Sequence, residues 1–152
     1  MNPIALARVC VLFFLLPGGA LASNPGVPTP TELPGGRIVS LQEVRDLADG
    51  GARLIDVRSA LNYGRGHIPG AVLAPYKGNS ANRVDFDPSL DRFSLSALPE
   101  KRNTDVLIYS HGDTGWKSYK AAVTAIRSGY TRVHWFRKGL AAWEAVGLPV
   151  ER

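Results

Sequence analysis

The chain has 152 residues, enough for one domain of ordinary size. Hydrophobic residues make up 45% and charged residues 20%, close to the globular average, which excludes a disordered or fibrous chain. The formal net charge is +5, but the basic residues form no cluster, so nucleic acid is not an expected partner.

Residues 1–22 have the pattern of a signal peptide. Arg8 precedes an apolar run at 9–16, and Ala20-Leu21-Ala22 has the small-x-small form that signal peptidase cleaves. A membrane anchor is the alternative, but a spanning helix needs ~20 apolar residues and this run is far shorter. We expect a mature chain that begins at Ser23, is periplasmic or secreted, and has no stable membrane span.

Cys10 is the only cysteine of the chain, and it lies in the segment that cleavage would remove. The mature chain would then have no thiol, no disulfide and no cysteine metal site. The three histidines, His67, His111 and His134, lack the spacing of metal ligands. We therefore expect neither a metal nor a cofactor.

Residues 23–36 contain four prolines and three glycines, which is typical of an extended linker with little to bury. The domain is expected over residues 37–152. Apolar periodicity and turn residues predict strands at 38–39, 53–57, 71–73, 105–109 and 133–136, and helices at 40–50, 94–98, 118–127 and 140–146. Ser40 and Glu43 have the spacing of a capping box at the start of the first helix.

Short apolar strands that alternate with helices indicate an α/β fold: a central parallel sheet flanked by helices on both faces. Ligands of such sheets bind beyond the carboxyl ends of the strands, which points to the loop after Tyr109. Residues 76–92 are polar and irregular. Loops of this length are uncommon in compact domains and often carry a function or an insertion.

Two segments together resemble rhodanese-like domains. The first is Leu54-Ile55-Asp56-Val57-Arg58, followed by Gly66-His67-Ile68-Pro69-Gly70-Ala71. The second runs over 106–122, with Gly129-Tyr130, Trp143 and Gly147-Leu148-Pro149 behind it. Order and spacing match over about 38–150, so the resemblance implies a single rhodanese-like domain in which Asp56, Arg58 and His67 are structural.

In that family a loop of the form Cys-x-x-Gly-x-Arg-Ser leaves the central strand, and its cysteine accepts a sulfur atom as a persulfide. Alignment on Ser118 places this cysteine at Gly112. Alignment on the end of the strand places it at Ser110, with a loop two residues longer. Neither residue is a cysteine, so the resemblance implies a sulfurtransferase fold with an inactive active-site loop.

The stretch Gly112-x-x-Gly115-Trp116 also resembles a subgroup of exported rhodanese-like proteins with a Cys-x-x-Cys-Trp motif, associated with quinoprotein alcohol oxidation. This likeness suggests an exported redox protein, such as a quinoprotein dehydrogenase, as a partner. Because both cysteine positions are glycine, the redox chemistry of the subgroup does not carry over.

The loop retains features that suit a small oxyanion. The candidate residues are Ser110, His111, Gly112, Asp113, Thr114, Gly115, Trp116, Lys117 and Ser118. Two glycines permit close backbone approach, Ser118 is expected to open a helix with unpaired amides, and Lys117 and His111 add positive charge. Asp113 opposes this, because its carboxylate would repel an anion or occupy the loop amides itself. An occupied anion site and a self-satisfied loop are both open, and Trp116 either covers the pocket or offers a contact surface.

These residues favour a non-catalytic module that binds an oxyanion or a protein partner. The alternative is an enzyme of the sulfurtransferase superfamily with divergent chemistry, in which Ser110 or His111 acts. A serine hydroxyl needs an adjacent base and cannot form a persulfide, and no Gly-x-Ser-x-Gly turn surrounds Ser110.

Overall fold

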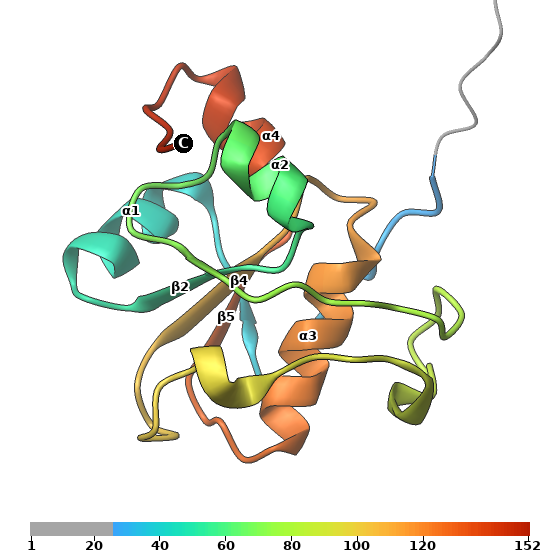
Figure 1. Cartoon of the computed structure of the whole chain (residues 1–152). Helices are drawn as coiled ribbons and strands as arrows, with labels where there is room; N and C mark the ends of the chain where they lie inside the picture. The colour runs from blue at the N-terminus through green and yellow to red at the C-terminus, as the bar shows by residue number, and fades with distance from the viewer. Residues whose placement is uncertain (1–25) are drawn as a thin grey trace, which may run out of the picture.

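A five-stranded parallel sheet forms the centre of the molecule (Figure 1). The computed structural model describes residues 26–152, so the predicted signal peptide and Cys10 lie outside the described residues. Along the sheet the strands follow the order β1-β5-β4-β2-β3, and every pair is parallel. The elements are β1 (Arg37–Ile38), α1 (Leu41–Asp49), β2 (Arg53–Asp56), α2 (Ala60–Arg65), β3 (Val72–Leu73), the 3-10 helices η1 (Pro88–Leu90) and η2 (Leu95–Ala97), β4 (Val106–Tyr109), α3 (Trp116–Arg127), β5 (Val133–Phe136) and α4 (Gly139–Ala145).

Helices cover both faces of this sheet, which confirms the predicted fold class. Leu107 and Tyr109 of β4 belong to a core cluster with residues of α1 and α4. Val106 and Ile108, which point to the opposite face, belong to the cluster that contains the buried face of α3. Figure 1 shows α1, α2 and α4 on one side and α3 on the other.

The predicted capping box is confirmed at α1, where the Glu43 amide donates to Ser40 Oγ at 3.3 Å and the Ser40 amide to Glu43 Oε2 at 2.8 Å. Helix α2 was not predicted. Its six residues are too few to show a helical period, and none of them is buried. Helix α3 begins at Trp116, two residues before the predicted start.

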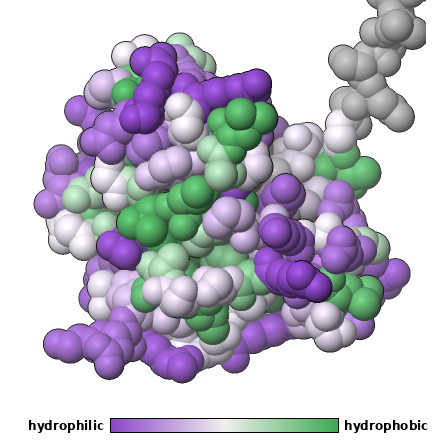
Figure 2. All heavy atoms as spheres, viewed as in Figure 1, coloured by the Kyte–Doolittle hydropathy of each residue, from purple (hydrophilic) through white to green (hydrophobic). Residues whose placement is uncertain are grey.

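The irregular stretch 76–92 packs in front of α3, as the green-to-yellow part of Figure 1 shows. Asp91 holds it together: its carboxylate accepts hydrogen bonds from the Tyr76 hydroxyl at 2.6 Å, the Ser80 hydroxyl at 2.6 Å, and the amides of Asn79 and Ser80 at 2.6 and 2.7 Å. Burial acts to raise the pKa of Asp91, but the hydrogen bonds from Ser80 and Tyr76 outweigh it and lower the pKa to about 2. On the face of the molecule drawn in Figure 2, hydrophobic residues reach the surface as separate patches among hydrophilic ones.

Residues 26–36 pack against the domain, whereas the sequence predicted a linker with little to bury. Thr29 is 3% exposed and Leu33 6% exposed. Leu33 joins the core cluster on the α3 side, and Arg137 donates from Nε to the Pro30 carbonyl at 2.8 Å and from Nη2 to the Thr29 carbonyl at 2.9 Å. The proline-rich composition stiffens this segment, and contacts from distant residues fix its course. None of the helices within 26–152 has the length and hydrophobicity needed to cross a membrane.

Candidate functional site

The carboxyl ends of β2 and β4 bring two chain reversals together. Asp56 and Tyr109, the last residues of these strands, are direct neighbours in the sheet. The segment 57–59 and the loop 110–115 therefore leave the sheet side by side. This is the edge at which parallel sheets bind ligands, and it contains most of the residues singled out from the sequence.

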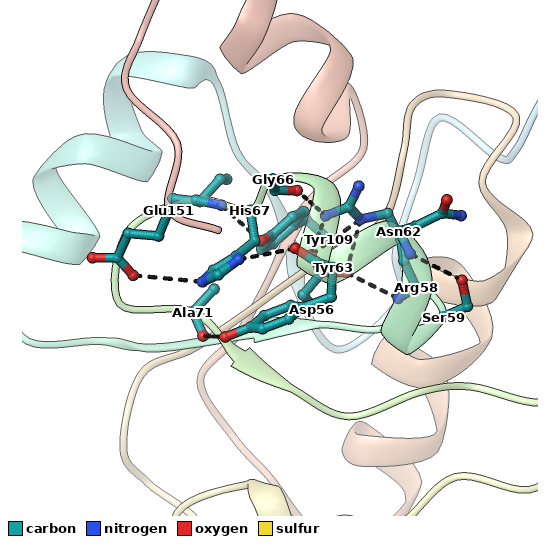
Figure 3. Close-up of polar contacts among 11 residues, drawn as sticks. Asp56, Arg58, Ser59, Asn62, Tyr63, Gly66, His67, Ala71, Tyr109 and Glu151 are labelled. Atoms are coloured by element: carbon teal, nitrogen blue, oxygen red, sulfur yellow. Dashed lines mark hydrogen bonds and ion pairs between the residues drawn. The ribbon is translucent and has the colours of Figure 1, made fainter.

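Asp56 and Arg58 form a buried ion pair at this edge (Figure 3). Arg58 Nη2 donates to Asp56 Oδ2 at 2.6 Å and to the Gly66 carbonyl at 2.6 Å, while Nε lies 3.0 Å from both carboxylate oxygens. Burial acts to lower the pKa of Arg58, but the hydrogen bonds and charge of Asp56 outweigh it and raise the pKa. The pair thereby ties β2 to the turn that follows α2.

His67 lies on the far side of this pair from the loop (Figure 3). Its ring stacks on Tyr63 with centroids 3.6 Å apart, Nδ1 lies 3.1 Å from the Tyr63 carbonyl oxygen, and Nε2 lies 3.5 Å from the Glu151 carboxylate. Beside it the Ile68 amide donates to the Tyr109 hydroxyl at 3.0 Å, and burial raises the pKa of Tyr109. These contacts anchor the turn and the C-terminal residues.

Ser110 directly follows β4, and its hydroxyl is taken up by the loop. It is 4% exposed and donates to Ser118 Oγ at 2.8 Å. The Ser118 hydroxyl donates to the Gly115 carbonyl at 2.8 Å and accepts the Trp135 indole N–H at 3.0 Å. No His, Asp, Glu or Lys of residues 26–152 is within hydrogen-bond distance of Ser110 Oγ, so this hydroxyl lacks the base that a serine nucleophile requires.

Several loop amides are paired within the loop. The amides of Gly115, Trp116 and Ser118 donate to the carbonyls of residues 112, 114 and 115 at 2.8, 3.1 and 3.1 Å. The expectation of unpaired amides from Ser118 is therefore wrong, because α3 starts earlier and its first turn closes on the loop. Gly115 permits this closure, since a Cβ there would lie 2.0 Å from Ser110 Oγ and 2.7 Å from the Gly112 carbonyl oxygen.

Asp113 faces away from the site, which corrects the expectation that its carboxylate opposes an anion. Lys138 Nζ donates to Asp113 Oδ2 at 2.9 Å, and Arg137 Nη1 lies 3.8 Å from the same oxygen. The hydrogen bond and charge of Lys138 lower the pKa of Asp113. Its backbone carbonyl accepts the Thr29 amide at 2.8 Å and hydroxyl at 2.6 Å. The negative charge of the loop is thus neutralised outside the pocket.

Trp116 is buried beneath residues 26–34. It is 7% exposed, and its indole N–H donates to the Val27 carbonyl at 2.8 Å. Its ring meets Tyr119 edge to face, with centroids 5.6 Å apart. Trp116 therefore offers no exposed contact surface, and residues 26–34 hold its ring in place.

A cavity of about 390 Å³ lies beside the loop, between the start of α2, the irregular stretch 76–92 and the first turns of α3. No carboxylate of residues 26–152 lines it. The lining residues are Arg58, Ser59, Asn62, Gly78, Asn82, Ser110, His111, Thr114, Gly115, Trp116, Lys117 and Lys120.

Seven of these lining residues were predicted from the sequence, whereas Gly112, Asp113, Ser118, Asp56 and His67 do not line the cavity. The sequence missed Lys120, a cation on the apolar side of α3. Its position three residues after Lys117 was the available signal, because residues three apart on a helix are neighbours. Within residues 26–152, no group of three or more His, Cys, Asp or Glu is arranged to hold a metal.

Comparisons with known proteins match most of the chain. The sequence matches the family described as rhodanese-like domain over residues 40–146. It is 30% identical over 113 residues to thiosulfate sulfurtransferase 16, chloroplastic, of Arabidopsis thaliana, covering 74% of this chain and 91% of that protein. It is 32% identical over 97 residues to a sulfurtransferase of Allochromatium vinosum, covering 64% and 76%. The crystal structure of the Alr3790 protein from Anabaena sp. aligns with a TM-score of 0.52 at 26% identity, over 72% of this chain and 88% of that one.

Proposed function

Because the chain belongs to the rhodanese-like domain family but has no cysteine in the loop after β4, we propose that it is a non-catalytic member that binds a small oxyanion beside that loop. Ser110 follows the strand directly and is the residue we assign to the position of the family cysteine.

The charge of the cavity supports binding of an anion. Among residues 26–152, Arg58, His111, Lys117 and Lys120 line it, and no carboxylate does. Asp56 and Asp91 form ion pairs with Arg58 and Lys120 from outside the lining, so the exposed Lys117 contributes the positive charge that is not paired. Asp113, the acidic residue of the loop, is held by Lys138 outside the lining. A concave surface lined by cationic groups attracts anions.

The state of Ser110 argues against catalysis. Relatives named as sulfurtransferases must accept a sulfur atom, and an oxygen cannot form a persulfide. The Ser110 hydroxyl donates a hydrogen bond to Ser118, and His111, which is exposed, makes no hydrogen bond to it. We expect the purified protein to show no thiosulfate:cyanide sulfurtransferase activity, and turnover at the rate of a cysteine-containing rhodanese would refute the non-catalytic role.

A thermal shift experiment tests the binding. Phosphate or sulfate should raise the melting temperature above that in chloride at matched ionic strength, because a ligand of the folded state stabilises it by about 2.7 kcal/mol at 100 times Kd. The variant Lys117→Ala should lose much of this shift, whereas Arg45→Ala on α1 should keep it. The chloride reference is needed because sulfate also stabilises proteins by exclusion from their surface. Equal shifts in wild type and Lys117→Ala would refute the proposal.

We also propose that the chain is exported, on the strength of the pattern in residues 1–22. Intact mass of the protein recovered from its native compartment should correspond to a chain that begins at Ser23. A retained Cys10 in a membrane fraction would support an anchor instead.

A further inference from the structure

The cavity is larger than an inorganic oxyanion needs. At about 30 Å³ for a water molecule, a five-atom oxyanion fills on the order of 100 Å³. The cavity measures about 390 Å³, within the range of roughly 300–1,000 Å³ occupied by small organic ligands. The extra space is bounded by α2 on one side and the irregular stretch 76–92 on the other.

Lys120 supplies a buried cation at this wall. The residue is 2% exposed. Its Nζ donates to the Ser80 carbonyl at 2.8 Å and to Ser80 Oγ at 2.9 Å, and it forms an ion pair with Asp91 Oδ2 at 3.9 Å, which is beyond hydrogen-bond length. The ring centroid of Phe86 lies 5.5 Å away. An ammonium has three donors, so one N–H is without a hydrogen-bond acceptor among residues 26–152.

Arg58 adds a second donor to the same cavity. Its Nε and Nη2 are used by Asp56 and Gly66, and Nη1 has no hydrogen-bond acceptor among the described residues. Lys117 is exposed at the cavity edge. Two buried donors and one exposed cation suit a tetrahedral head group better than a single carboxylate, because each donor can bind a separate oxygen of the head group.

The rest of the lining is polar but uncharged. Asn62 stands in the first turn of α2 and Asn82 in the irregular stretch, and both side chains line the cavity with no hydrogen-bond partner among residues 26–152. Ser59 and Thr114 add hydroxyl groups. Amides and hydroxyls both donate and accept, so they match the hydroxyl groups of a ligand.

Building on the proposed function, we infer that the ligand is a small organic phosphate with a hydroxyl-bearing body, of the class of glycerol and sugar phosphates. Its phosphate group lies against Lys120 and Arg58, and its hydroxyls meet Asn62 and Asn82. A phosphate monoester presents three oxygens that accept hydrogen bonds, which matches the donors of Arg58, Lys120 and Lys117.

Isothermal titration calorimetry of the full chain tests this inference with glycerol 3-phosphate, inorganic phosphate and glycerol. Glycerol 3-phosphate should bind at least tenfold more tightly than inorganic phosphate, and glycerol should show no binding. Asn82→Ala should weaken glycerol 3-phosphate at least threefold and leave inorganic phosphate unchanged. Lys120→Met should weaken both phosphates about tenfold, whereas Lys77→Met, an exposed lysine of the same stretch outside the lining, should weaken neither.

The outcomes separate the two proposals. If neither phosphate binds to the wild type, the proposed function fails. If inorganic phosphate binds as tightly as glycerol 3-phosphate, or Asn82→Ala does not discriminate between them, the organic ligand class is wrong while the oxyanion site stands. If Lys120→Met does not fold, the Asn82 comparison decides, because Asn82 is exposed and its side chain has no contact that the fold requires.

Discussion

Replacement of Asp91 by asparagine should destabilise the protein by about 2 kcal/mol at neutral pH. The pKa of this carboxylate falls from 3.8 to about 2 in the folded chain, and each pKa unit corresponds to about 1.4 kcal/mol. Asparagine has the same shape, but its NH₂ group replaces one of the two carboxylate oxygens. In the wild type both oxygens accept hydrogen bonds, for example from the Ser80 amide. The side chain is 2% exposed, so solvent screening does not reduce the effect.

Urea unfolding of wild type and Asp91→Asn between pH 7 and pH 2 measures this effect. Because the pKa of Asp91 is depressed by folding, the carboxylate stabilises the folded state above about pH 4, and this contribution disappears as the pH falls towards 2. The difference between the two proteins should therefore be constant at neutral pH and narrow in acid. Asp85→Asn is the matched control, since its ion pair with Arg83 is exposed and its loss should leave the stability almost unchanged.

Equal stability of wild type and Asp91→Asn at pH 7 would show that Asp91 does not hold the stretch 76–92 together. A difference that stays unchanged down to pH 2 would show that the effect is one of shape and not of charge.

The loop gives three further predictions. Gly115→Ala should destabilise the protein by roughly 1–3 kcal/mol, because its Cβ overlaps the Ser110 hydroxyl, whereas Gly112→Ala, whose Cβ would have ordinary contacts at 3.8 Å, should be nearly neutral in thermal unfolding. Ser110→Ala should cost about 1 kcal/mol for its lost hydrogen bond to Ser118, and an unchanged melting temperature would contradict the role of this hydrogen bond. Trp116→Phe should remove the hydrogen bond to Val27 and speed proteolysis of the N-terminal segment, and an unchanged cleavage rate would contradict its role as an anchor.

Most of the fold could be predicted from the sequence because its strands are short, apolar and separated by helices with clear start and stop residues. The capping box of Ser40 and Glu43 has both hydrogen bonds in the structure. Helix α2 was missed because it is short, contains Gly64 and buries none of its residues, so it leaves no periodic pattern.

The site was predicted only in part. The loop was located from the order of strand, glycines and helix, and residues such as Lys117 and His111 do line the cavity. Asn62 and Asn82 were missed because they come from segments with no shared motif, and only the packing of α2 and residues 76–92 beside α3 brings them to the cavity. Lys120 was missed although it follows Lys117 by three residues on the same helix.

The sequence by itself determines that the loop after β4 carries no thiol, since this depends on residue identity alone. It also determines the parallel α/β fold, since continuous apolar strands and amphipathic helices can bury their surfaces together in few other ways. Only the tertiary structure decides that Asp113 faces Lys138, that Ser110 bonds to Ser118 and that Lys120 is buried beside the cavity. The direction in which a polar side chain points depends on partners distant in sequence, such as Lys138, 25 residues from Asp113, and Ser80, 40 residues from Lys120.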